Sequence, residues 1–220
     1  AIGNIAMGTG VTIIGGGACG CNNIAFGISA LSAITQGTDN IGIGLTSGDA
    51  LTTGADNIAI GRSALAVSIN DADCNIALGI FAMGTGDVSG SGNIAIGSVA
   101  MANVLAGTYN VGIGESVLCS LTTGDNNIAI GQLAMTALTT GADNTAIGLN
   151  AMDALTSGHT NIAIGKNALG AATIGIYNVA IGELALGAGV TTGFKNIAIG
   201  LSAMDALTTG CRNIAMGQNA

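Results

Sequence analysis

The chain repeats one short motif along its whole length, and this repeat constrains the fold more than any other feature. The motif is Asn, then Ile or Val, Ala, Ile and Gly, and it recurs every 17 to 19 residues. Positions are counted here from this asparagine, the anchor. The anchors are Asn4, Asn23, Asn40, Asn57, Asn75, Asn93, Asn110, Asn127, Asn144, Asn161, Asn178, Asn196 and Asn213. Residues 1–220 therefore form a single array of 13 repeats, which we expect to be a segment of a longer fibre.

The residues around the anchor alternate with a period of two, as in a β-strand. Glycine occupies position +4 in all 13 repeats and position −3 in 11 of them, which favours two turns per repeat. A period of 17 to 19 residues is too short for a pair of helices. The sequence predicts an all-β fold: a parallel β-solenoid, or β-roll, of about 13 coils. We expect a second strand in each coil, in stretches such as residues 134–140.

The two faces of the predicted strand differ in side-chain size. Position +1 is Ile or Val in 12 of 13 repeats and position +3 is always large and apolar, which predicts two apolar ladders forming the core. Position +2 is only Ala or Gly, so we expect its face to pack against other copies of the chain around a shared axis. A tight bend within a monomer is the alternative explanation. The residues assigned to inter-chain packing are Ala59, Ala77, Ala95, Gly112, Ala129, Ala146, Ala163 and Ala180.

The anchor asparagines occupy the same corner of every predicted coil. There each side chain is placed to hydrogen-bond the equivalent group in the coils above and below, as in stacked Asn ladders. The alternative is that Asn merely tolerates a left-handed corner. The predicted ladder comprises Asn40, Asn57, Asn75, Asn93, Asn110, Asn127, Asn144, Asn161, Asn178 and Asn196.

The run Asn-Ile-Ala-Ile-Gly-x-x-Ala-[Leu/Met] resembles the head repeat of the YadA-like trimeric autotransporter adhesins. The connections Leu121–Gly124 and Leu138–Gly141, both Leu-Thr-Thr-Gly, are similar to those of bacteriophage tail fibres. The resemblance covers all 13 repeats. It implies a left-handed parallel β-roll in which three chains pack about one axis, as a homotrimer. The common head repeat is shorter, so the extra residues here are expected in larger loops.

Charge and hydropathy exclude two classes of partner. The net charge is −8, and the four basic residues are scattered, which argues against nucleic acid. Gly, Asn, Thr or Ser interrupts every apolar stretch before it reaches the roughly 18 residues of a membrane span, so we expect no membrane insertion.

No group of residues in the sequence indicates catalysis, so we expect neither an enzyme nor a cofactor. The single histidine, His159, is interpreted as a solvated turn residue. Asp39 and Asp56 stand just before consecutive anchors, and as stacked carboxylates they are weak candidates for a calcium site. The five cysteines, Cys19, Cys21, Cys74, Cys119 and Cys211, are expected to be mostly free thiols. Free thiols favour a phage fibre that folds in the cytoplasm over a secreted adhesin.

We therefore predict a structural or adhesive fibre on the surface of a phage virion or a bacterial cell. It would present a multivalent face to a host receptor or glycan. The most variable loops, residues 9–19, 66–74, 84–90 and 102–107, are the predicted contact points. The alternative is a monomeric ice- or surface-binding solenoid. It would use the stacked pairs Thr52-Thr53, Thr122-Thr123, Thr139-Thr140, Thr191-Thr192 and Thr208-Thr209.

Overall fold

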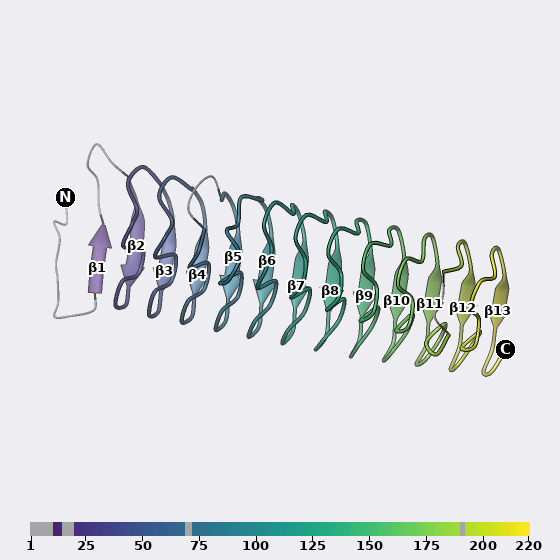
Figure 1. Cartoon of the computed structure of the whole chain (residues 1–220). Helices are drawn as coiled ribbons and strands as arrows, with labels where there is room; N and C mark the ends of the chain where they lie inside the picture. The colour runs from purple at the N-terminus through teal and green to yellow at the C-terminus, as the bar shows by residue number, and fades with distance from the viewer. Residues whose placement is uncertain (1–10, 15–19, 69–71, 190–191) are drawn as a thin grey trace.

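The protein is a rod of stacked coils, each contributing one strand to a single sheet (Figure 1). The computed structural model describes residues 11–14, 20–68, 72–189 and 192–220. The strands are β1 (Val11–Ile14), β2 (Asn23–Phe26), β3 (Ile41–Ile43), β4 (Ile58–Ile60), β5 (Ile76–Leu78), β6 (Ile94–Ile96), β7 (Val111–Ile113), β8 (Ile128–Ile130), β9 (Thr145–Ile147), β10 (Ile162–Ile164), β11 (Val179–Ile181), β12 (Ile197–Ile199) and β13 (Ile214–Met216). Their order in the sheet is their order in the chain, and no helix occurs among the described residues. The predicted all-β parallel solenoid is confirmed, with about 11 turns from β2 to β13 and a repeat of about 17 residues.

Strands β2 to β13 pair in parallel and in strict repeat register. Ala163, for example, pairs with Ala146 in β9 and with Ala180 in β11. The first strand departs from this pattern, because β1 pairs with β2 in the antiparallel direction. The repeat anchored at Asn4 lies outside the described residues.

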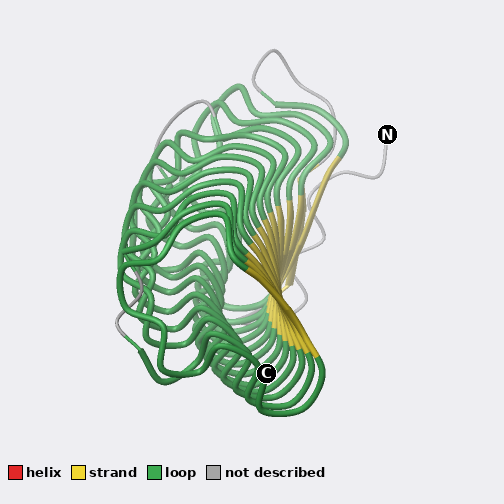
Figure 2. Ribbon diagram, turned by 90° about the vertical axis from the view of Figure 1, so that its right-hand side faces the viewer, coloured by secondary structure: helices red, strands yellow, loops and turns green. Residues whose placement is uncertain are grey.

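Each described coil contains one strand, so the prediction of a second strand is wrong. Residues 134–140 form turns and bends, and Leu133 and Met135 have φ values of 59° and 51°. Left-handed residues at positions +6 and +8 recur along the stack and keep this stretch from extending. The turns still bond to the next coil, since Met135 N donates to Ala151 O at 3.0 Å. The coil is therefore closed by stacked turns (Figure 2).

The two repeated glycines serve different purposes. Gly131, at position +4, has a φ of 134°, and a Cβ there would lie 2.5 Å from Gly148 O in the next coil. Gly141, at position −3, has no positive φ, but its Cβ would lie 2.2 Å from Gly158 O. The first glycine is needed for its dihedral angle and for space, and the second for space alone.

The interior of each coil is narrow and is filled mainly from the turns. Position +8 supplies large side chains such as Leu118 and Met135, which are completely buried. Position +2 faces them from the strand: a Cβ on Gly42 would lie 2.7 Å from Leu31 Cγ. Only Ala or Gly fits opposite these large residues, because the space left between strand and turn holds little more than a methyl group.

The predicted faces of the strand are therefore reversed. The position +2 residues lie inside their own chain and do not face other copies. Ala59 is 2% exposed, and the alanines at the other assigned positions are completely buried. These are Ala77, Ala95, Ala129, Ala146, Ala163 and Ala180, while Gly112 is also buried. The tight bend within one chain, which was the alternative explanation, accounts for their small size. The large residues at +1 and +3 point outward instead.

Candidate functional site

The outward side of the sheet carries a continuous double column of large apolar side chains, which we call the outer face. It comprises positions +1 and +3 of β2 to β13. Midway along the rod, Ile128 and Ile130 are 40% and 37% exposed, although the coils on either side cover part of each. Ile162 and Ile164 are 40% and 38% exposed. The outer face is interrupted by one hydroxyl residue, Thr145.

The outer face is large for the surface of a single chain. Eleven steps of about 4.8 Å give a length of about 53 Å, and two columns of side chains give a width of about 13 Å. The resulting area of about 700 Å² exceeds the largest apolar patch of a typical monomer. It is close to the area that each partner contributes to a standard protein interface, about 800 Å².

Two exposed columns flank the outer face, one at each end of the strand. We call position −1 the leading rim and position +5 the trailing rim. The leading rim is Asn22, Asp39, Asp56, Cys74, Gly92, Tyr109, Asn126, Asp143, Thr160, Tyr177, Lys195 and Arg212. The trailing rim is Ile28, Leu45, Arg62, Ile80, Ser98, Glu115, Gln132, Leu149, Lys166, Glu183, Leu201 and Gln218. An apolar centre between rims that carry polar and charged residues is the usual layout of a protein interface.

A ladder of buried asparagines holds the strand in position behind the outer face. Asn127 Nδ2 donates to Asn110 Oδ1 at 3.0 Å and to Gly141 O at 2.8 Å. Asn127 N donates to the same Asn110 Oδ1 at 2.9 Å. Equivalent bonds link the predicted ladder residues from Asn40 to Asn196, and all of them are buried. The ladder therefore has a structural role, because it satisfies backbone groups at the corner of each coil.

The threonine pairs lie on the turns, away from the sheet. The first threonine of a pair uses its hydroxyl to join coils: Thr122 Oγ1 donates to Thr139 O at 2.9 Å, and Thr139 Oγ1 to Thr156 O at 3.1 Å. An ice-binding surface would depend on the second threonine, such as the exposed Thr140. Thr191 of the fourth pair falls outside the described residues.

The candidate ligand and metal residues do not converge. Asp39 and Asp56 lie in consecutive coils as expected, and Asp39 accepts a hydrogen bond from Asn22 at 3.0 Å. Among the described residues, no three His, Cys, Asp or Glu side chains gather as a metal site would need. His159 contacts Thr160 at 3.3 Å and packs edge-on against Tyr177, with ring centroids 5.6 Å apart. Calcium binding stays a prediction.

Three of the cysteines are free thiols: Cys74, Cys119 and Cys211. Cys21 lies beside Asn22 at the leading rim, and Cys19 falls outside the described residues. In the part of the chain that the structure describes, no helix is long and apolar enough to span a bilayer.

The variable loops are only partly described, since residues 9–10, 15–19 and 69–71 fall outside the described ranges. Loops 84–90 and 102–107 stack on each other, with Ser89 N donating to Leu105 O at 2.6 Å. Val88 and Val104 are buried beneath them, so these loops extend the solenoid wall. Their role as contact points stays a prediction.

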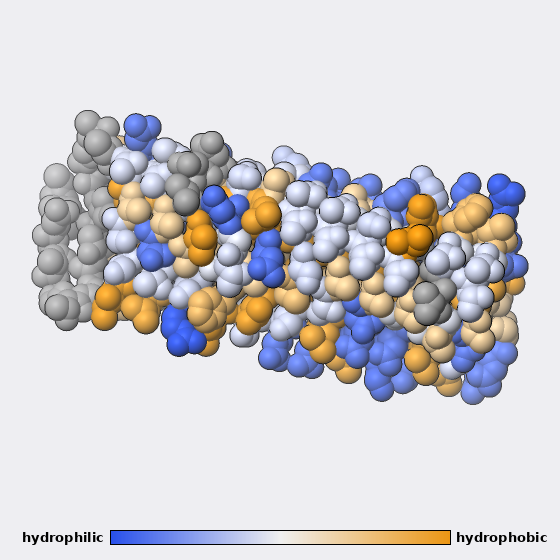
Figure 3. Space-filling view, viewed as in Figure 1, coloured by the Kyte–Doolittle hydropathy of each residue, from blue (hydrophilic) through white to orange (hydrophobic). Residues whose placement is uncertain are grey.

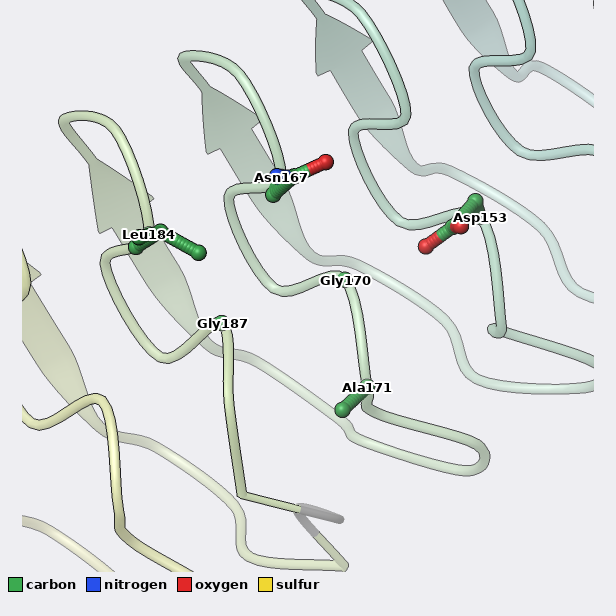
Figure 4. A pocket seen from close by; sticks show the side chains of 6 residues that line it. All are labelled: Asp153, Asn167, Gly170, Ala171, Leu184 and Gly187. Carbon is green, nitrogen blue, oxygen red and sulfur yellow. The ribbon is translucent and has the colours of Figure 1, made fainter.

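A cleft of about 270 Å³ interrupts the turn side (Figure 4). Its lining is Asp153, Asn167, Gly170, Ala171, Leu184 and Gly187. Asp153, Gly170 and Gly187 occupy the same position, +9, in three consecutive coils. The cleft forms because the two glycines have no side chain to fill the space that Asp153 fills in its own coil. Desolvation raises the pKa of Asp153, against the lowering effect of the backbone N–H groups of Asp153 and Ala154. One carboxyl group and one amide in an open cleft do not make a catalytic arrangement.

Among the residues that the structure describes, the turn side has no counterpart of the outer face. Figure 3, which views the rod from the turns, shows hydrophobic residues in small groups among pale and hydrophilic ones. The sheet, on the opposite side of the coils in Figure 2, is thus the surface with a continuous apolar stripe. No protein-family model, curated protein or solved structure matches this chain.

Proposed function

We propose that the chain is a structural and surface-binding shaft that associates through its outer face into a homotrimeric fibre. The observation that carries this proposal is the apolar double column, broken only at Thr145, in which Ile128, Ile130, Ile162 and Ile164 are each more than a third exposed. In water, a rod with only 7% charged residues gains most by covering this surface with other copies of itself. The resemblance to YadA-like heads and phage tail fibres supports the same arrangement.

The width of the outer face favours a small number of chains. From the leading to the trailing rim, the extended segment measures about 20 Å. Three such walls enclose a triangular space whose sides lie about 6 Å from the axis, a distance that isoleucine side chains span. Four walls would lie about 10 Å from the axis and leave a channel. Three copies therefore bury the outer face without a central void.

In this proposal the trimer acts as a rigid spacer outside a phage virion or a bacterial cell. It presents three equivalent turn sides to a host receptor or glycan, so that weak single contacts add up to avidity. Its function is mechanical and adhesive, without catalysis or a cofactor.

Light scattering tests the proposal directly, with an expected mass of three times 21.1 kDa. Replacing Ile130 with Asp places three carboxylates at the axis and is expected to yield monomers. The matched control is Thr140→Asp, on the exposed turn side, which should stay trimeric. A monomeric parent protein would refute the trimer, and a trimeric Ile130→Asp variant would refute the role of the outer face.

A further inference from the structure

The two rims carry complementary residues at the same level of the rod. Asp56 of the leading rim and Arg62 of the trailing rim belong to the same coil, six residues apart. Tyr109 and Glu115 stand in the same relation, and so do Tyr177 and Glu183. The chain has only two tyrosines and two glutamates, and all four belong to these couples.

These couples cannot form within one chain, because the rims lie at opposite ends of a segment about 20 Å long. Tyr109 is 67% exposed and Tyr177 is 50% exposed. Along each rim the side chains contact neighbouring coils instead. Lys166 Nζ lies 3.4 Å from Glu183 Oε1 with both side chains about half exposed, which makes a weak surface pair. Each couple thus offers complementary groups that face away from each other.

We infer that the leading rim of one copy contacts the trailing rim of the next, in register, around an axis parallel to the rod. This inference rests on the proposed function, and its partner is a second copy of this chain. Cyclic symmetry about such an axis always places a coil beside the same coil of the next copy. Asp56 then pairs with Arg62 of the neighbour, and the hydroxyls of Tyr109 and Tyr177 donate to the neighbour's Glu115 and Glu183.

Charges one coil apart obey the same rule. Neighbouring coils are about 4.8 Å apart, a distance that lysine and arginine side chains span. In the proposed arrangement, a charged residue on one rim therefore finds either an opposite charge or no charge on the facing rim within one coil of its own level. The additional pairs are Asp39 with Arg62, Asp143 with Lys166, and Lys195 with Glu183. Complementary rims fix the direction and register of the copies, whereas the uniform isoleucine centre permits sliding by whole coils.

An antiparallel pair of rods is the competing arrangement. It would bring the leading rim of one rod against the leading rim of the other. The symmetry of such a pair does not fix which coil of one rod faces which coil of the other. Cysteine cross-linking separates the two arrangements, because a disulfide forms only when two Cα atoms approach within about 7 Å.

The experiment places cysteines at Asn126 and Gln132, the two rims of one coil, in a chain whose five native cysteines are replaced by serine. Cys74 already occupies the leading rim with a φ of 56°, so the backbone at Asn126, with a φ of 56°, accepts cysteine. We expect Asn126→Cys with Gln132→Cys to give a covalent trimer on a non-reducing denaturing gel. Each single variant should give monomers. Covalent dimers of Asn126→Cys alone, or no cross-link in the double variant, would overturn the inference.

Charge reversal provides a second test that does not depend on cysteine replacement. Within one chain, Asp56→Arg removes a like-charge stack with Asp39 and should be harmless. Between copies it faces Arg62, so we expect the trimer's dissociation constant to rise by about tenfold or more. The same is expected of Arg62→Asp, and the swap of both residues should return the constant to within about threefold of the parent. Thr140→Arg is the control for added charge.

These outcomes also separate the two proposals. A parent protein of three chains in which the single reversals have no effect, or in which the swap gives no recovery, would refute the rim contacts and leave the fibre proposal standing. A parent protein of one chain would refute the fibre proposal itself.

Discussion

Asn144 Nδ2 donates a hydrogen bond to Asn127 Oδ1, 3.1 Å away, across 17 residues of sequence. The same Oδ1 accepts the backbone N–H of Asn144 at 3.1 Å. The Asn127 side chain also donates to Asn110 Oδ1 and Gly141 O, so it donates two hydrogen bonds, accepts two and joins three successive coils. This relationship, repeated along the rod, ties every strand to its neighbours on both sides.

The first prediction concerns this ladder. Asn127→Asp keeps the shape of the side chain but replaces its amide donor with a carboxylate oxygen, which then faces two acceptors, Asn110 Oδ1 and Gly141 O. We expect a loss of about 3 to 5 kcal/mol in the free energy of unfolding, from lost bonds and unsatisfied buried acceptors. Gln36→Glu, the same change from amide to carboxylate on the exposed turn side, is the control and should change stability by less than about 0.5 kcal/mol. Chemical denaturation measures both, and equal effects would contradict the ladder's importance.

The second prediction concerns the glycine at position +4. Gly131→Ala adds a Cβ 2.5 Å from Gly148 O at a φ of 134°, so we expect a loss of at least about 3 kcal/mol. Gly217→Ala has a similar φ of 125° but nothing within 4 Å, which isolates the dihedral cost. Thermal unfolding should show a clearly smaller loss at Gly217. If the losses were the same, the contact with the next coil would not be the limiting factor.

The third prediction tests the narrow interior with one substitution at two equivalent sites. Gly42→Ala places a Cβ 2.7 Å from the branched Leu31 Cγ, and we expect a loss of about 1 to 3 kcal/mol. Gly112→Ala meets the flexible end of Met101 at 3.0 Å and Val117 at 3.1 Å. Because Met101 can move aside, the expected change is under about 1 kcal/mol. The measurement is the denaturant concentration at the unfolding midpoint of each variant. A greater loss of stability for Gly112→Ala than for Gly42→Ala would contradict this packing.

The fourth prediction concerns pH. Desolvation raises the folded-state pKa of Asp153 above 3.8, so the folded protein holds its proton to a higher pH than the unfolded chain does. Stability from this group is therefore present below pH 3.8 and falls as pH rises through the folded-state pKa. Asp153→Asn should raise the melting temperature at pH 7, and the gain should shrink at pH 3. A gain in melting temperature that is larger at pH 3 than at pH 7 would contradict a raised pKa of Asp153.

The position +2 residues show what a local pattern leaves open. Alternation by two places Ala129 on one side of its strand and Ile128 and Ile130 on the other, but it is symmetrical between inside and outside. The sequence did contain a signal that was overlooked: Ala134 and Met135, at positions +7 and +8, are apolar in nearly every repeat and also need an interior. With those side chains filling the coil, only the small face of the strand fits inward.

By itself, the sequence determined the parallel solenoid, its repeat length and the place of the asparagine ladder. These follow from local spacing: an insertion-free stretch from anchor to glycine returns each asparagine to the same corner. Only the tertiary structure decided which face of the strand is exposed and that the second half of the coil is turns. Both depend on the left-handed residues at +6 and +8, such as Leu133 and Met135, which bend the chain back over the alanines. Stacking of whole coils imposes those angles, because ordinary side chains disfavour them when isolated.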